Sequence, residues 1–433
     1  MKIAVLGIWH LGSVVSACIA SKKNRVFAID RDKLKIEKLN SAKAPIFEPN
    51  LNKLLQKKID ENQLSFHSDM DCISGVDVLW VTYDTPVDDD DNADINFVID
   101  NIKEAIKFVT DTTLILLSSQ LPVGSTRKLE KYVNRNFSSK NITFACSPEN
   151  LRLGSSISYF QDPDRVVVGI RNKKDEDKIK KLFKEITNKI EIMSVESAEM
   201  TKHAINGFLA TSVTYANEIA SICELVGADA KDVERGLKTE SRIGSKAYLS
   251  PGSAFAGGTL ARDIQFLNSQ SQNHILTPLL SSIKQSNDEH KNWIRRKISI
   301  NFPDIQNLRV CVWGLTYKPE TDTLRRSLSI ELCNWLFDKG AIINAFDPVI
   351  KSLPKDLEDK INLFNKPLEA LANCDVLVIG TEWKVFKDLN LVDTNKQKSL
   401  VVIDSNRFIH QNSYIDGLKY YSVGSSYIKD NKL

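Results

Sequence analysis

Short apolar runs that alternate with longer helix-like segments constrain this chain's fold more than any other feature. In the first 150 residues each run is four residues long, and the runs lie at 3–6, 26–29, 78–81, 114–117 and 142–145. Near-continuous apolar runs separated by helices are typical of a parallel sheet that is buried on both faces. We therefore predict an α/β fold that begins with a Rossmann-like parallel sheet.

The alternation of short apolar runs and helices gives way to long helical segments at about residue 197 and resumes after residue 303. Helical segments are expected at 198–226, 230–236 and 277–300, and a second series of apolar runs follows at 308–314, 342–346, 376–379 and 401–404. A chain of 433 residues is also too long for one core of the usual size. We expect three domains: a dinucleotide-binding domain at 1–196, a helical central domain at 197–303 and an α/β domain at 304–433. Ligands usually bind in clefts between such domains.

Charge and cysteine content narrow the classes of partner. The net charge is only +3, from 58 basic and 55 acidic residues, so neither nucleic acid nor a membrane is expected to be a partner. The seven cysteines are scattered and show no metal-ligand spacing, which predicts reduced thiols in the cytoplasm and no metal site. Residues 1–20 do not fit a signal peptide, because Gly7 and Gly12 interrupt their apolar run.

The first strand and the turn after it have the layout of a dinucleotide-binding unit. A strand ends at Gly7, a helix is expected to open at Gly12, and Asp30 closes the second strand. In such units the helix N-terminus faces the pyrophosphate and the acid accepts hydrogen bonds from the ribose, which favours NAD. Trp9, however, replaces the second glycine of the fingerprint, so a Rossmann domain without a nucleotide stays an alternative. The residues expected at the cofactor are Gly7, Trp9, His10, Leu11, Gly12 and Asp30.

Lys202 and Asn206 lie four residues apart on an expected helix and therefore share one face. A lysine can stabilise a developing alkoxide, and an asparagine can hold its geometry. The spacing alone equally fits two exposed residues on an amphipathic helix, and this alternative stays open. The apolar content of the same helix, 198–226, predicts the core of a homodimer.

A series of ordered motifs resembles the UDP-glucose/GDP-mannose dehydrogenase family, which makes sugar-nucleotide uronic acids. The resemblance runs from residue 1 to about residue 408. Its motifs lie at 46–49, 85–86, 121–125, 147–152, 162–169, 198–202, 206–210, 217–218, 242–244, 257–258, 318–319, 321–322, 325, 347–348 and 381–383.

The resemblance implies roles for particular residues. Lys202 and Asn206 would contact the reacting sugar hydroxyl, and Asp263 would orient a proton-accepting water or the lysine. Near the cofactor would lie Thr85, Pro86 and Arg325. The substrate would be bound by Glu149, Asn150, Leu151, Arg152, Lys202, Asn206, Gly258 and Lys318, with Arg242 reaching it across a subunit boundary.

The chain departs from the family at the residues of the second half-reaction. The family oxidises an alcohol to an aldehyde and then a cysteine adduct to a thioester, a step that needs a thiolate. Here the segment from Gly258 to Asp263 is one residue short, and the cysteine position falls on Thr259 or Leu260. Gln120 and Leu153 also replace the family's threonine and glutamate.

We therefore expect an NAD-dependent oxidoreductase that takes a nucleotide sugar through one two-electron step. Two alternatives stay open: a redox-neutral epimerase or isomerase that retains its NAD, and a catalytically silent protein that binds sugar nucleotides. A β-hydroxyacid dehydrogenase would share the first domain and the Lys/Asn pair, but the second α/β domain argues against it.

Overall fold

The computed structural model describes residues 1–22, 24–88, 93–149, 151–256, 258–271, 275–389, 391, 400–410 and 418–425. The chain divides into two compact units, residues 1–205 and 206–433. Helix α8 (Val195–Val226) begins in the first unit and ends in the second.

The first unit is built on a sheet whose described strands follow the order β3-β2-β1-β4-β5-β6-β7-β8. All neighbours are parallel except β6 and β7. The direction of strand addition reverses between β1 and β4, and open α/β sheets bind ligands at this kind of switch point. The strands are β1 (Lys2–Leu6), β2 (Arg25–Ile29), β3 (Leu64–His67), β4 (Val78–Val81), β5 (Leu114–Leu117), β6 (Thr143–Cys146), β7 (Val166–Ile170) and β8 (Ile190–Met193).

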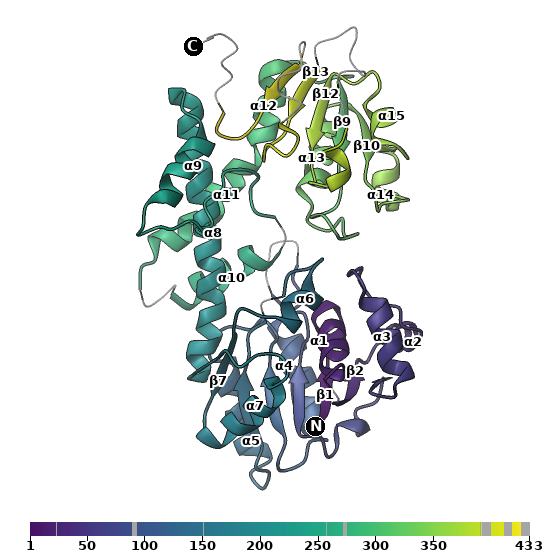
Figure 1. Cartoon of the computed structure of the whole chain (residues 1–433), viewed down its shortest axis with the longest axis vertical. Helices are drawn as coiled ribbons and strands as arrows, with labels where there is room; N and C mark the ends of the chain where they lie inside the picture. The colour runs from purple at the N-terminus through teal and green to yellow at the C-terminus, as the bar shows by residue number, and fades with distance from the viewer. Residues whose placement is uncertain are drawn as a thin grey trace. The chain divides into compact units, whose positions relative to one another are not determined.

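Helices cover both faces of this sheet (Figure 1). Because successive strand side chains point to opposite faces, Ile3 and Val5 pack in one apolar cluster, whereas Ala4 and Leu6 pack in another. The helices are α1 (His10–Ala20), α2 (Lys33–Asn40), α3 (Leu51–Asp60), α4 (Ile95–Ile106), α5 (Ser125–Asn136), α6 (Ser156–Gln161) and α7 (Lys173–Phe183), with a 3₁₀ turn at Asp71–Ile73.

The second unit contains helices followed by a parallel sheet with the order β11-β10-β9-β12-β13-β14. Its switch point lies between β9 and β12. The helices are α9 (Ala230–Thr239), α10 (Gly258–Ser271), α11 (Pro278–Lys291), α12 (Trp293–Asn301), α13 (Leu328–Asp338), α14 (Lys355–Glu358) and α15 (Pro367–Leu371), with a 3₁₀ turn at Lys384–Phe386. The strands are β9 (Arg309–Trp313), β10 (Ile342–Phe346), β11 (Asn362–Leu363), β12 (Val376–Ile379), β13 (Leu400–Ile403) and β14 (Leu418–Tyr421).

The core of the second unit repeats the two-faced packing of the first. Val310 and Val312 of β9 pack in one cluster with α12 and α13, and Cys311 and Trp313 pack in the other with α15. The predicted α/β fold with two parallel sheets and a helical middle segment is therefore confirmed.

Several local predictions differ from the structure. The helix after Gly7 begins at His10 rather than Gly12, and α8 begins at Val195 rather than residue 198. The segment 277–300 is two helices: Asn292, with a ψ of −4°, ends α11 and is the N-cap residue of α12. No helix in the described ranges is long and apolar enough to cross a membrane.

Candidate active site

Two glycines let β1 and α1 approach each other closely. Gly7 has a φ of +92°, and a Cβ there would lie 2.8 Å from the backbone nitrogen of Tyr83. A Cβ on Gly12 would lie 2.1 Å from the carbonyl oxygen of Gly7 and 2.9 Å from Oγ1 of Thr82. Both positions therefore require glycine, as the first and third positions of a dinucleotide fingerprint do.

Asp30 ties the end of β2 to this turn. Its Oδ2 accepts hydrogen bonds from the Ile8 N–H at 2.9 Å and from Lys35 Nζ at 2.8 Å, and its Oδ1 accepts from the Asp32 N–H at 3.1 Å. A carboxylate offers about four lone-pair directions, so Oδ1 retains one for a further donor. The carboxylate is thus oriented by the protein and can still accept a ribose hydroxyl.

The second sheet also has an aspartate after its second strand, but the contacts of this aspartate differ from those of Asp30. Asp347 follows β10 as Asp30 follows β2, but its two oxygens have five contacts, made by the N–H groups of Leu315, Thr316 and Val349, Oγ1 of Thr316 and Nε1 of Trp383. Four of these contacts are to Oδ2, and of the five only that of the Val349 N–H is to Oδ1. The connection after β9 also runs for 14 residues before α13, against three between β1 and α1. Among the segments that the structure describes, the short glycine turn of a dinucleotide site is found between β1 and α1 and not between β9 and α13.

Three of the predicted cofactor residues open α1 itself. Trp9 is the N-cap residue, with an indole that is 41 % exposed and lies under the Lys35 ammonium, 5.8 Å from the ring centroid. His10 points to the buried Glu48 carboxylate, with Nε2 and Oε2 2.8 Å apart, and Leu11 packs on the apolar core. Burial alone would raise the pKa of Glu48, but hydrogen bonds from His10 and from the N–H groups of Gly154 and Ser156 lower it. Within the described part of the chain no side chain caps α1, so its first amides are available to an anion.

Within the first unit, Lys202 and Glu149 meet at a small cavity. Their Nζ and Oε1 atoms lie 3.6 Å apart, and the lysine side chain is only 12 % exposed. The cavity has a volume of about 20 Å³, which is enough for one water molecule. Its lining also includes Ser119, Gln120 and Cys146. The alternative of an exposed surface lysine does not fit this environment.

Within the second unit, Asn206 donates a short hydrogen bond from Nδ2 to Oδ2 of Asp263. Both side chains are buried, so the carboxylate and the amide fix each other's orientation. The structure thus joins two of the predicted catalytic residues that are 57 positions apart in the chain.

The segment in which the resemblance places the family's cysteine is helical. Gly258 is the first residue of α10, so Thr259 and Leu260 lie in its first turn. Thr259 is exposed, and Leu260 packs beside the buried side chains of Ala210 and Ile264. An apolar side chain therefore occupies one of the two candidate cysteine positions.

A larger cavity of about 350 Å³ lies at the switch point of the second sheet. Predicted residue Lys318 lines it, together with segments that follow β9, β12 and β13. The lining combines aromatic rings, cationic groups and hydroxyls, and includes Tyr248, Lys291, Arg295, Thr316, Tyr317, Ser327, Glu382 and Asn406. The Glu382 carboxyl also lines this cavity. Burial raises its pKa, which favours the neutral form.

The backbone before Gly258 is held by side chains from three other elements. The carboxamide of Asn217 accepts from the Gly252 N–H at 2.9 Å, and Asn406 accepts from the Ser253 N–H at 2.7 Å. Asn287 exchanges two hydrogen bonds with the backbone of Phe255. This segment also lines the 350 Å³ cavity, so its position is fixed before any ligand enters.

The other predicted residues have diverse environments. Thr85 is buried and donates to the Gln120 carbonyl at 2.6 Å, and Pro86 lies one residue further along that loop. The Leu151 N–H donates to Glu149 Oε2 at 2.7 Å. Three predicted arginines are exposed: Arg152 over the Tyr159 ring, Arg242 beside Glu240, and Arg325. Asn150 lies outside the described residues.

Sequence reasoning assigned no role to several residues that the structure places at these cavities. Glu382 and Glu199 lie in motifs that carry the family resemblance, so these motifs could have indicated a role for both residues. Asn217 was in such a motif as well. Tyr248 and Asn406 gave no local signal, because only the fold brings them to the larger cavity.

Three family models match the chain in order. They are the NAD binding domain of the UDP-glucose/GDP-mannose dehydrogenase family at residues 1–187, its central domain at 196–289 and its UDP binding domain at 311–411. The chain belongs to the UDP-glucose/GDP-mannose dehydrogenase family. It is therefore an NAD-dependent enzyme of the nucleotide-sugar dehydrogenase type.

Curated relatives align over nearly the whole chain. UDP-glucose 6-dehydrogenase of Rickettsia prowazekii is 33% identical over 436 residues, covering 98% of this chain and 100% of the relative. UDP-glucose 6-dehydrogenase of Rhizobium meliloti is 31% identical and covers 98% and 99%. A solved UDP-glucose dehydrogenase from Pyrobaculum islandicum has the same fold, with a TM-score of 0.87, 23% identity and 98% coverage of each chain.

The residues of the first turn fit the cofactor of this family. Glycine at 7 and 12 permits the close approach of β1 and α1, the uncapped amides of α1 suit a pyrophosphate, and Asp30 has an acceptor for a ribose hydroxyl. Trp9 occupies the position of the fingerprint's second glycine, which has no side chain. Its exposed indole contacts the Lys35 ammonium.

Proposed function

We propose that this protein oxidises a nucleotide sugar with NAD through a single two-electron step and forms a carbonyl compound rather than a uronic acid. The observation that carries the proposal is that Thr259 and Leu260, where the resemblance places the family's cysteine, lie in the first turn of α10 and carry no thiol. UDP-glucose is the first substrate to test, because the curated relatives bear the name UDP-glucose 6-dehydrogenase.

The nucleotide part of the substrate is assigned to the 350 Å³ cavity of the second unit. Lys318, Lys291 and Arg295 supply positive charge for a diphosphate, and Tyr248 and Tyr317 supply aromatic surface. The match of residues 311–411 to the family's UDP binding domain supports this assignment. The proposal also retains the division into domains at 1–196, 197–303 and 304–433.

The first oxidation is assigned to Lys202, Asn206 and Asp263. NAD, held at the turn of Gly7 and Gly12 and by Asp30, would supply the hydride acceptor for the carbinol carbon, and the hydroxyl proton would pass to a water. The Lys202 ammonium, 3.6 Å from Oε1 of Glu149, would stabilise the developing alkoxide. Asn206, oriented by Asp263, would donate to the same oxygen, and Asp263 would orient the water.

The second oxidation lacks its nucleophile in this account. All seven cysteines lie in the described part of the chain and are unpaired, and six of them are buried. Cys146 shares a cavity with Lys202, but burial raises the pKa of its thiol well above the ordinary value and the charge of Glu199 adds to the effect. A neutral buried thiol is a poor nucleophile. Gln120 and Leu153 remove, by the family resemblance, two further groups of this step.

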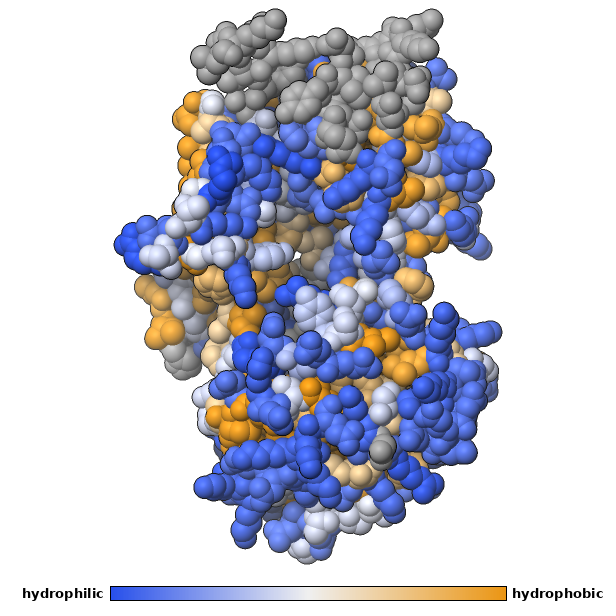
Figure 2. Space-filling model, in the orientation of Figure 1, coloured by the Kyte–Doolittle hydropathy of each residue, from blue (hydrophilic) through white to orange (hydrophobic). Residues whose placement is uncertain are grey.

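We also propose that the enzyme is a homodimer formed through α8. Phe208, Tyr215 and Ile222 follow one another at seven-residue intervals and are 67 %, 47 % and 55 % exposed. This spacing keeps all three on one side of the helix, where a second copy of the stripe can pack. Leu225 and Val226 extend it, and Figure 2 shows apolar surface at the upper left, where Figure 1 draws the end of α8 and α9. Exposed Arg242 would then be free to reach the partner's substrate. The reduced thiols favour a cytoplasmic enzyme.

The test is a panel of UDP-, GDP-, CDP- and dTDP-sugars with NAD, followed by NADH fluorescence and mass spectrometry of the products. The proposal predicts NADH together with a product two hydrogens lighter than the substrate. An epimer without net NADH would identify an isomerase that retains its cofactor. Binding of NAD and nucleotide sugar without any product would identify a silent binding protein, and a uronic acid would overturn the single-step account.

A further inference from the structure

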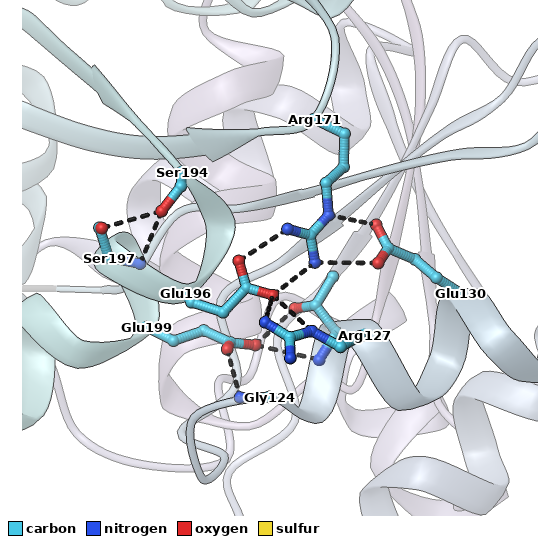
Figure 3. Close-up of polar contacts among 9 residues, drawn as sticks. Gly124, Arg127, Glu130, Arg171, Ser194, Glu196, Ser197 and Glu199 are labelled. Atoms are coloured by element: carbon cyan, nitrogen blue, oxygen red, sulfur yellow. Dashed lines mark hydrogen bonds and ion pairs between the residues drawn. The ribbon is translucent and has the colours of Figure 1, made fainter.

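The first turns of α8 hold the N-terminus of α5 through one buried carboxylate. Glu199 Oε2 accepts from the Gly124 N–H at 2.6 Å, and its Oε1 accepts from the N–H and Oγ1 of Thr126 at 3.0 and 2.6 Å (Figure 3). Gly124 is the N-cap residue of α5, with a φ of +90° and no side chain to cap the helix. Glu199 therefore supplies this cap from another helix.

One turn later, α8 holds the other end of the same loop. His203 Nε2 lies 2.9 Å from the Leu121 carbonyl oxygen, which makes that nitrogen the donor. Residues at i and i+4 share one face of a helix, so Glu199 and His203 contact the loop at 121–126 from the same side of α8. Lys202 lies between these two contacts in the sequence.

The two contacts and Lys202 line one cavity. Its lining includes Glu199, Lys202 and His203 of α8, Gln120 and Leu121 of the loop, and Thr126 of α5. The 3.6 Å distance between Lys202 and Glu149 is longer than a hydrogen bond and does not by itself fix a flexible lysine side chain. The position of the lysine is thus set mainly by where α8 lies against the loop.

We propose that Glu199 is a positioning residue for Lys202: by capping α5 from α8, it fixes the register of α8 against the loop at 121–126. This inference rests on the proposed role of Lys202 in stabilising the alkoxide. Glu199 touches no reacting atom in this account, and it acts through the place that it gives the lysine.

Glu196 offers a matched control on the same helix. It lies one turn before Glu199, but its carboxylate binds Arg127 at 2.6 Å and Arg171 at 2.7 Å, and Arg171 continues to Glu130 (Figure 3). None of these four residues lines the cavity of Lys202. Glu196 thus also joins α8 to α5, but through part-exposed ion pairs between side chains rather than through the first amides of α5. Such pairs contribute little, so the loss of Glu196 is expected to lower stability slightly without moving the lysine.

The experiment compares Glu199→Gln with Glu196→Gln. In Glu199→Gln an NH₂ group replaces one carboxylate oxygen and faces the donors of Gly124 and Thr126. Hydrogen bonds of the cap are therefore lost, and we expect α8 to shift. Because misplacement by about 1 Å costs on the order of a hundredfold in rate, we expect kcat to fall by about 10- to 100-fold. KM and the calorimetric affinity for NAD should change by less than about threefold. Glu196→Gln should lower the melting temperature and leave kcat within about twofold.

A double-mutant cycle with Lys202→Ala separates positioning from general loss of structure. If Glu199 acts through Lys202, Glu199→Gln should lower kcat in the wild type but not further in the Lys202→Ala background. An equal loss in both backgrounds overturns the inference, as does an unchanged kcat of Glu199→Gln beside an impaired Lys202→Ala. An unchanged kcat of Lys202→Ala overturns the proposed role of the lysine and this inference together.

Thr126→Val serves if Glu199→Gln does not fold. It removes only the hydroxyl that donates to Glu199 and retains both backbone contacts. The expected fall in kcat is about three- to tenfold, again absent in the Lys202→Ala background. A wild-type kcat for this variant overturns the inference.

Discussion

Gly12→Ala tests the close contact on which the proposed cofactor turn depends. The new methyl group would lie 2.1 Å from the Gly7 carbonyl oxygen and 2.9 Å from Thr82 Oγ1. The first of these neighbours is backbone, so α1 must move away from the end of β1. Gly236 of α9 provides the control, because a methyl group there meets nothing within 4 Å.

The two substitutions should have opposite effects on stability. Inserting a methyl group into a packed site typically costs 1–3 kcal/mol, and the overlap with backbone places Gly12→Ala at about 3 kcal/mol. For a unit of 205 residues this lowers the melting temperature by about 6–12 °C. Gly236→Ala should instead gain about 0.5–1 kcal/mol, because alanine favours the helix more than glycine does.

Calorimetry measures both consequences. Scanning calorimetry should show a lower transition for Gly12→Ala and an unchanged or higher one for Gly236→Ala. Titration with NAD should show at least about tenfold weaker binding for Gly12→Ala alone, because displaced α1 amides no longer face the pyrophosphate. Wild-type stability and NAD affinity in Gly12→Ala would refute the inferred contact.

Three further changes test other parts of the account. Asp30→Asn should weaken NAD binding by about tenfold in calorimetry, through loss of the ribose acceptor and of the Lys35 contact; unaltered affinity would contradict the assigned site. The hydrogen bond from Arg171 lowers the pKa of Glu196 to about 2 from its ordinary 4.5, so stability from this pair is complete above pH 4.5 and is lost as the pH falls towards 2. The difference in unfolding free energy between wild type and Glu196→Gln, measured with urea, should shrink over that range, and a constant difference would argue against the pair. Ile222→Glu should convert the dimer to a monomer in light scattering, whereas a wild-type protein that is monomeric at micromolar concentration would exclude the proposed interface.

The fold was largely predictable because the buried strands are almost wholly apolar. Strands such as β4 and β5 are buried at every residue and stand out in the sequence. β3 and β8 lie at the ends of the sheet order, where polar residues alternate with apolar ones in short runs, and they gave no clear signal. The break at Asn292 was missed because helical spacing continues through it on both sides.

The candidate site was predictable only where its residues are close in sequence or belong to family motifs. The spacing of Lys202 and Asn206 indicated a shared helix face, but their burial and their pairing with Glu149 and Asp263 depend on contacts between distant segments. The hydrogen bond from Ser253 to Asn406 joins residues 153 positions apart, and no local pattern records it. The same holds for the cap that Glu199 provides for α5, since the helix lacks an ordinary N-cap residue and its partner lies 75 positions away.

The ratio of NADH formed to nucleotide sugar consumed tests the central claim most directly. Purified enzyme is incubated with excess NAD and a limiting nucleotide sugar, UDP-glucose first, and both quantities are followed in the same sample. A single two-electron step predicts a ratio of one and an aldehyde or ketone product, and Leu260→Cys should give the same ratio because Gln120 and Leu153 remain. A ratio of two with a carboxylate product from the wild-type enzyme would show that another nucleophile completes the second oxidation and would contradict the account.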